Sequence, residues 1–157
     1  SVSPRIKSSA NYQNGRMALL QAQEDGYDGV LMLDGTGHVT EEPRACLFMV
    51  RDGVPITPPV TSDILESITR ETIIQLFREE HGLEVREREV DRTEVYVADE
   101  LFLCGSGMEI QPVGGVDRIS IGDGRPGPVT TAIRKTYMAI VSGETDLHPE
   151  WRTPVYA

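Results

Sequence analysis

The stretch Ala45-Cys46-Leu47-Phe48-Met49-Val50 is an unbroken apolar run, and Arg51-Asp52-Gly53 follows it directly. An apolar run of this length that ends at a turn signal predicts a buried strand. The Asp-Gly pair predicts a tight turn, so the chain is expected to fold back there as a hairpin. A second run, Glu100-Leu101-Phe102-Leu103-Cys104, predicts another strand. The two runs indicate a fold organised around a β-sheet.

Helices are predicted beside these strands, over residues 11–25, 69–81 and 128–141. Each has apolar residues at helical spacing or a glycine at its end. Further strands are predicted, a buried one over residues 29–33, an exposed, alternating one over residues 83–90, and two around glycine turns over residues 109–113 and 116–121. Because strands and helices alternate irregularly, the pattern predicts an α+β fold with a mixed sheet and flanking helices, not a repeating βαβ unit.

The composition excludes several classes of function. The chain has 157 residues, which is typical of a single domain, and a formal net charge of −10. That charge argues against a nucleic acid or an anionic membrane as partner. With two cysteines and no apolar stretch long enough to span a bilayer, a reduced, cytoplasmic setting is expected. The three histidines have no metal-ligand spacing, so no metal site is predicted.

The first candidate site is Ile6-Lys7-Ser8-Ser9-Ala10-Asn11-Tyr12. Lys7 is one of only two lysines, the other being Lys135, and it lies beside small residues and a tyrosine just ahead of a helix. A lysine amine in such a place could trap a carbonyl group, as the Schiff-base lysine of a pyridoxal-phosphate enzyme does. The alternative is a solvated lysine near a terminus, which this stretch taken alone favours.

Glu41 is the second candidate, because it follows the short strand after the turn at Gly35 and Gly37. A carboxylate in that position could bind a protonated ring nitrogen. The alternative is a surface carboxylate beside Glu42, which Glu41 taken alone favours.

Two stretches could bind a phosphate. Leu65-Glu66-Ser67-Ile68-Thr69-Arg70 lies at a predicted helix start, where free N–H groups favour an anion. The alternative is that Thr69 only caps the helix. Cys104-Gly105-Ser106-Gly107-Met108-Glu109-Ile110 follows a buried strand, and its small residues would let backbone amides approach a ligand. The alternative there is a simple glycine-rich turn.

Seven short motifs follow one another along the chain: Lys7…Asn11-Tyr12, Leu33-Asp34…Val39-Thr40-Glu41, Asp52-Gly53…Thr57-Pro58-Pro59, Ile68-Thr69-Arg70, Ala98-Asp99-Glu100…Gly105-Ser106, Glu109-Ile110…Pro112-Val113 and Gly127-Pro128-Val129-Thr130. In this order they resemble the large, C-terminal domain of branched-chain amino acid aminotransferases, which are fold-type IV pyridoxal-phosphate enzymes. The resemblance covers nearly the whole chain. It implies a mixed β-sheet or pseudo-barrel with flanking helices, as in the large domain of D-amino acid aminotransferase-like enzymes.

The resemblance also implies roles for individual residues. Lys7 would be the catalytic residue, carrying the Schiff base to pyridoxal 5'-phosphate and shuttling a proton to and from the substrate α-carbon. Tyr12 would hydrogen-bond the phenolic oxygen of the cofactor, and Glu41 would hold its ring nitrogen.

The resemblance further implies which residues bind the cofactor phosphate and the substrate. The amides of Ile68 and Thr69, with the hydroxyls of Thr69 and Ser106, would bind the cofactor phosphate. The amides of Ser106 and Gly107 would face the substrate carboxylate. No metal takes part in this set.

The chain departs from the family pattern in two places. Where the family has a run of small residues and then an asparagine after the glutamate, this chain has Glu42-Pro43-Arg44-Ala45-Cys46. Bulk, rigidity and a charge therefore lie close to the expected substrate side. Ser67 stands where a glycine is usual before Ile-Thr-Arg, which predicts a slightly reshaped phosphate loop.

The resemblance implies transamination between a branched-chain or other apolar L-amino acid and 2-oxoglutarate. The alternatives are an aminodeoxychorismate-lyase-like enzyme, a D-amino acid aminotransferase, or a catalytically retired binding module. The family also has a smaller N-terminal domain, to which nothing in this sequence corresponds. Residues 1–157 are thus expected to be the C-terminal cofactor-binding domain of a longer enzyme, inactive alone, that forms a homodimer or a higher oligomer.

Overall fold

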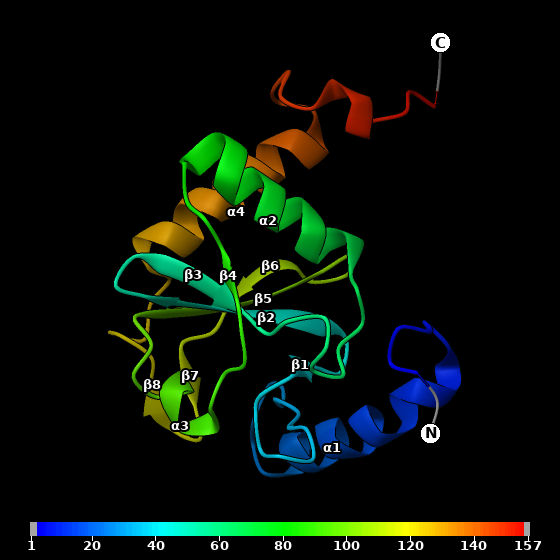
Figure 1. The fold of residues 1–157 in the computed structure, drawn as a ribbon, viewed down its shortest axis with the longest axis vertical. Coiled ribbons are helices and arrows are strands. Elements are labelled where there is room, and N and C mark those ends of the chain that lie inside the picture. The colour runs from blue at the N-terminus through cyan, green and yellow to red at the C-terminus, as the bar shows by residue number, and fades with distance from the viewer. Residues whose placement is uncertain (1–2, 156–157) are drawn as a thin grey trace.

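The computed structural model describes residues 3–155 and places a mixed sheet at the centre of the chain (Figure 1). Its strands are β1 (Glu41–Glu42), β2 (Ala45–Arg51), β3 (Val54–Thr57), β4 (Arg86–Glu87), β5 (Glu100–Gly105) and β6 (Glu109–Pro112). They lie in the order β4-β3-β2-β5-β6, with β1 paired to β2. Only the β3–β4 pair is parallel. A separate hairpin joins β7 (Gly115–Val116) to β8 (Ile119–Ser120).

Strand β2 lies between β3 and β5, which confirms the buried strand and the hairpin expected from the apolar run. Alternate side chains of β2 face opposite sides of the sheet. Phe48 lies directly opposite Phe102 of β5, and the two rings stack with centroids 5.0 Å apart. Leu47 and Met49 pack in a different cluster on the other face. Because both faces are covered, the strand is apolar throughout.

Helices α2 (Ile68–His81) and α4 (Pro128–Ser142) cover one face of the sheet (Figure 1). Ile73, Phe77 and Ile133 are fully buried there against Phe48 and its neighbours. Each helix ends at a glycine in the left-handed region, as the predicted stops require.

The other face is covered by shorter elements. They are α3 (Arg92–Val95), the β7–β8 hairpin and loops that carry Val39 and Val90. Helix α1 (Tyr12–Glu24) lies beyond β1, on the side away from α2 and α4 (Figure 1). Two short 3-10 turns complete the described elements, η1 (Ser9–Asn11) before α1 and η2 (Pro149–Trp151) near the C-terminus.

Three predicted strands differ from the structure. Residues 29–33 form no regular strand, and within residues 3–155 they pair only through Met32 with Thr40 and Glu41 and through a bridge from Leu33 to Val39. The strand expected over residues 116–121 is instead part of the β7–β8 hairpin. Over residues 83–90 only β4 pairs with β3. The ladder stops because β3 runs into two consecutive prolines, which have no N–H to donate.

Glu100 links the sheet to the start of α4. Its buried carboxylate accepts hydrogen bonds from the Val129 N–H at 3.0 Å and the Thr130 N–H at 2.6 Å. It thereby caps the first turn of α4, which has no capping side chain of its own. A Cβ at Gly127 would collide with this carboxylate, so the close approach requires glycine.

We expect Glu100→Ala to lower the free energy of unfolding by about 3 kcal/mol, because a buried and a partly buried N–H group would lose a charged acceptor. Urea unfolding of the variant measures the effect. Glu84→Ala is the matched control, since Glu84 is exposed, and it should change stability by less than about 0.5 kcal/mol. Equal losses in the two variants would show that the cap contributes nothing.

Candidate functional site

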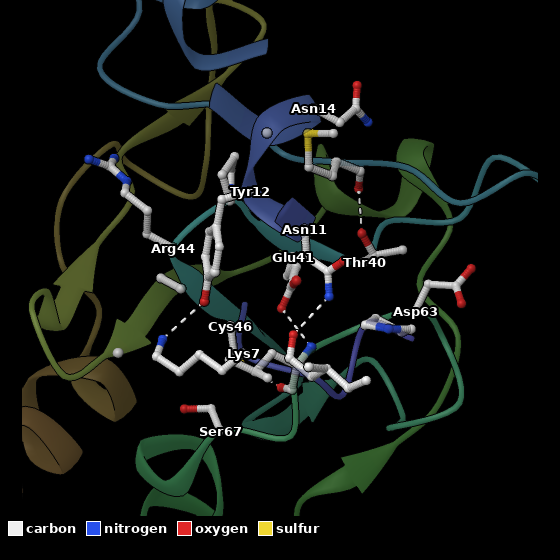
Figure 2. Close-up of a pocket in the computed structure, with 18 of the residues that line it drawn as sticks. Lys7, Asn11, Tyr12, Asn14, Thr40, Glu41, Arg44, Cys46, Asp63 and Ser67 are labelled. Atoms are coloured by element: carbon white, nitrogen blue, oxygen red, sulfur yellow. Dashed lines mark hydrogen bonds between the residues drawn. The ribbon is translucent and has the colours of Figure 1, made fainter. Parts of the chain in front are cut away.

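Lys7 lies in a loop that is held closed by Asn11. The Asn11 side-chain amide donates hydrogen bonds to the backbone oxygens of Ser3 and Ile6, both at 2.8 Å. The loop leads directly into α1, whose first residue is Tyr12. The Lys7 amine donates to the Tyr12 hydroxyl at 3.0 Å, and Figure 2 shows the two groups pointing toward one another. The local structure therefore fixes both functional groups together.

Helix α1 is seated against the turn between β1 and β2. A Cβ at Gly15 would lie 2.6 Å from Cβ of Pro43, closer than carbon atoms pack. The glycine thus lets the helix approach the turn, and it brings Lys7 and Tyr12 beside the strand that begins at Glu41.

Glu41 is half-buried, and one oxygen of its carboxylate accepts the Leu65 N–H at 3.1 Å. Burial raises the pKa of Glu41 to about 7, and the neighbouring Glu42 carboxylate adds to the rise. The Leu65 amide and the positive charge of Lys7 act in the opposite direction. A carboxyl group whose charge is this poorly stabilised favours a positively charged partner.

Backbone amides without a hydrogen-bond partner among the described residues occur at two places, the start of α2 and the turn between β5 and β6. Ser67 caps α2 by accepting the Arg70 N–H at 3.4 Å, so the cap is Ser67 and not Thr69 as the sequence suggested. Within residues 3–155, no hydrogen bond uses the N–H of Ile68 or Thr69. The same holds for the N–H groups of the β5–β6 turn at residues 106–107. Free amides of this kind bind anions.

These elements enclose a cavity of about 440 Å³ (Figure 2), a volume typical of small-molecule sites. Five of the seven predicted site residues line it: Lys7, Tyr12, Glu41, Ser106 and Gly107. Ile68 and Thr69 do not line it, although Ser67, immediately before them, does. Ile68 is 85% exposed at the helix start, whereas Thr69 is buried behind it.

No role was assigned from the sequence to several residues that build this site. Asn11, Gly15 and Leu65 act through contacts with residues that the sequence alone does not place beside them. Cys46 also lines the cavity, where burial raises the pKa of its thiol to about 11. The thiol therefore stays protonated near neutral pH.

A second hollow of about 810 Å³ lies between the C-terminal end of α1 and the β7–β8 hairpin. Its lining includes Leu31 and Val113 and has no lysine. The 440 Å³ cavity is therefore the candidate active site. Over the described part of the chain, no group of three or more His, Cys, Asp or Glu residues is arranged to hold a metal ion.

Residues 1–116 match the family described as amino-transferase class IV. The chain belongs to the class IV aminotransferases. The family resemblance drawn from the seven motifs is thus confirmed, and the α+β fold agrees with it. The chain is 45% identical over 151 residues to the branched-chain-amino-acid aminotransferase of Pseudomonas aeruginosa, covering 96% of this chain and 48% of that protein.

Solved structures of class IV enzymes give the same result. The branched-chain amino acid aminotransferase of Thermobaculum terrenum in its PLP form superposes with a TM-score of 0.96 at 49% identity, covering 99% of this chain and 51% of that one. The Escherichia coli branched-chain amino acid aminotransferase gives 0.95 at 39% identity, with coverages of 100% and 52%. The chain therefore spans about half the length of the relatives it matches. None of the helices over residues 3–155 is long and apolar enough to cross a membrane.

Proposed function

We propose that the complete protein uses pyridoxal 5'-phosphate to transfer an amino group between a branched-chain or other apolar L-amino acid and 2-oxoglutarate. The observation that carries the proposal is the 3.0 Å contact between the Lys7 amine and the Tyr12 hydroxyl, in one cavity with the Glu41 carboxylate. The PLP form of the Thermobaculum relative supports it, as does the similarity to branched-chain aminotransferases of two other bacteria. A retired binding module would have no need of all three groups.

The residues present fit the cofactor. A half-buried carboxylate with its pKa raised to about 7 suits a protonated ring nitrogen, and two pairs of free amides suit a phosphate and a carboxylate. We assign the ring nitrogen to Glu41 and the phenolic oxygen to Tyr12. The phosphate is assigned to the Ile68 and Thr69 amides and to the Thr69 and Ser106 hydroxyls. The Ser106 and Gly107 amides are assigned to the substrate carboxylate.

When bound, the cofactor supplies a conjugated, electron-accepting ring that stabilises negative charge at the substrate α-carbon. Lys7 supplies the amine that attaches the cofactor and, when released from it, moves a proton at Nζ. The hydrogen bond from Nζ to Tyr12 orients the amine. Glu41 holds a proton at the ring nitrogen, and the two amide pairs orient the anionic groups.

We further propose that residues 1–157 are the C-terminal cofactor-binding domain of a longer aminotransferase, with its smaller N-terminal domain outside this sequence. The half-length match to the relatives supports this proposal. The homodimer and the cytoplasmic location expected from the sequence stay predictions.

The chain alone should fold but should turn over at least about 10²-fold more slowly than the complete protein, because its site would be incompletely closed to water. Exposed apolar side chains on α1, such as Met17 and Leu20, should also favour self-association. Glutamate formation from several L-amino acids and 2-oxoglutarate measures turnover, and pyruvate release tests the lyase alternative. Comparable turnover of the two proteins would refute the half-enzyme proposal.

A further inference from the structure

The turn between β1 and β2 holds a fixed arginine at the cavity. The carboxylate of Glu42 is fully buried, and among the described residues it accepts hydrogen bonds from Arg44 alone: the backbone N at 2.6 Å, Nη2 at 2.8 Å and Nε at 3.1 Å. A buried carboxylate is costly unless it is paired, so this three-point contact holds the Arg44 side chain in one orientation. The guanidinium is therefore preorganised.

Arg44 keeps donors that Glu42 does not use. Its side chain is half exposed, and within residues 3–155 no hydrogen bond involves Nη1. The edge of the guanidinium that carries Nη1 is open to a ligand. An arginine edge of this kind matches a carboxylate, to which it donates two parallel hydrogen bonds.

The position of Arg44 separates it from the Lys7 amine. Figure 2 shows the Arg44 side chain beside the Tyr12 ring, with its guanidinium extending away from the Lys7 amine. Its backbone lies beside the β5–β6 turn, because a Cβ at Gly105 would be 3.0 Å from the Arg44 carbonyl oxygen. The free amides at residues 106–107 begin at that same turn. One wall of the cavity therefore presents two distinct places for an anionic group.

The charges of the cavity narrow the choice of ligand. Of the described residues that line it, Lys7 and Arg44 are the only cations, against the carboxylates of Asp34, Glu41 and Asp63. The chain as a whole carries a formal net charge of −10, so a local cation would favour the binding of an anionic substrate. Because Lys7 is assigned to the cofactor, Arg44 is the cation that the described lining residues leave for the substrate.

We propose that Arg44 determines specificity by binding the second carboxylate of a dicarboxylic substrate, the five-carbon 2-oxo acid or its amino acid. The inference rests on the proposed function. It assigns a role to the arginine found in residues 42–46, where this chain differs from the family pattern. Glu42 acts as a positioning residue through Arg44. The amides at residues 106–107 take the first carboxylate, and Arg44 takes the one at the far end of the chain of carbons.

The test compares glutarate, which has two carboxylates, with pentanoate, which has the same length and only one. Calorimetric titration of the complete protein, loaded with pyridoxal phosphate, measures both dissociation constants. Arg44→Gln keeps a hydrogen-bond donor for Glu42 and removes the charge. It should weaken glutarate binding by about 10- to 100-fold and change pentanoate binding by less than about twofold.

Arg78→Gln is the matched control, because it removes an equally exposed arginine that pairs with Glu79 outside the cavity. It should leave glutarate binding unchanged. If Arg44→Gln does not fold, Arg44→Lys is used instead. Lysine keeps the positive charge but cannot donate two parallel hydrogen bonds to one carboxylate. Glutarate binding should still weaken several-fold, while pentanoate binding does not.

Equal weakening of glutarate and pentanoate, or the same loss in the Arg78 variant, would overturn the assignment. Transamination is measured in a separate assay, so a failure of the Arg44 assignment can be distinguished from a failure of the proposed function. Selective loss of glutarate binding in a protein without aminotransferase activity supports the Arg44 site and refutes the proposed function. If the enzyme is active and its glutarate affinity is the same in the Arg44 variant, only the Arg44 site is refuted.

Discussion

Replacing Lys7 by alanine in the complete protein should reduce transamination by at least about 10³-fold, because both covalent attachment and proton transfer would be lost. Of the described residues that line the cavity, Lys7 alone carries an amine, and that amine is held at 3.0 Å from the Tyr12 hydroxyl. The folded state should survive, since the Lys7 side chain is exposed. Initial rates with a saturating amino donor and 2-oxoglutarate provide the measurement.

A chemical trap tests the same assignment without turnover. Borohydride reduction in the presence of pyridoxal phosphate, followed by peptide mapping, should place the pyridoxyl group on Lys7. Lys135→Arg is the control, because Lys135 is the other lysine of the chain and lies exposed on α4, outside the cavity. Modification of Lys135, or full activity of the Lys7 variant, would sink the assignment.

The parts of the fold that could be predicted are those in which local pattern and burial agree. Strands β2 and β5 are apolar throughout because both faces of each are covered. Helices α2 and α4 have apolar faces and terminal glycines because they cover one side of that sheet. In these segments the polarity of each residue matches its burial, so the sequence alone is sufficient to predict the strand or helix.

The segments that were mispredicted depend on partners far along the chain. The apolar run at residues 29–33 looks like a buried strand, but in the part of the chain that the structure describes it pairs only with the short segment at residues 39–41. The strand expected over residues 83–90 is cut short by the prolines that end β3. Neither limit is visible in the segment itself.

In the candidate site, too, some features could be predicted from the sequence and others could not. The motifs indicated Lys7, Tyr12 and Glu41 because the chemistry of these side chains is distinctive. The contacts that hold them are long-range or depend on shape: Leu65 on Glu41, and Gly15 against Pro43. Such contacts appear only once the chain is folded.

Glu41→Gln should lower the rate of transamination by about 10²-fold or more, while cofactor affinity falls much less. A neutral amide cannot hold a proton at the ring nitrogen, so the ring would lose its capacity to accept electrons. The amides assigned to the phosphate would be untouched. Steady-state rates and a fluorescence titration with pyridoxal phosphate separate the two effects, and unchanged turnover would make Glu41 only a structural carboxylate.

Glu41 should also shape the pH dependence of stability when the chain is studied without cofactor. Its pKa is raised by burial from 4.5 to about 7 in the folded state. Between these values the folded chain binds more protons at this site than the unfolded chain, so the contribution of Glu41 to stability falls as the pH rises from about 4.5 to about 7.

Urea unfolding at about pH 5 and about pH 8 measures this dependence. The decrease in the free energy of unfolding between the two pH values should be smaller in Glu41→Gln, because glutamine does not titrate. Glu84→Gln, at an exposed position, is the control and should behave as the parent chain does. An identical pH dependence in the parent and Glu41→Gln would mean that burial does not raise the pKa of Glu41. Glu41 would then have no reason to favour a positively charged ring nitrogen over water.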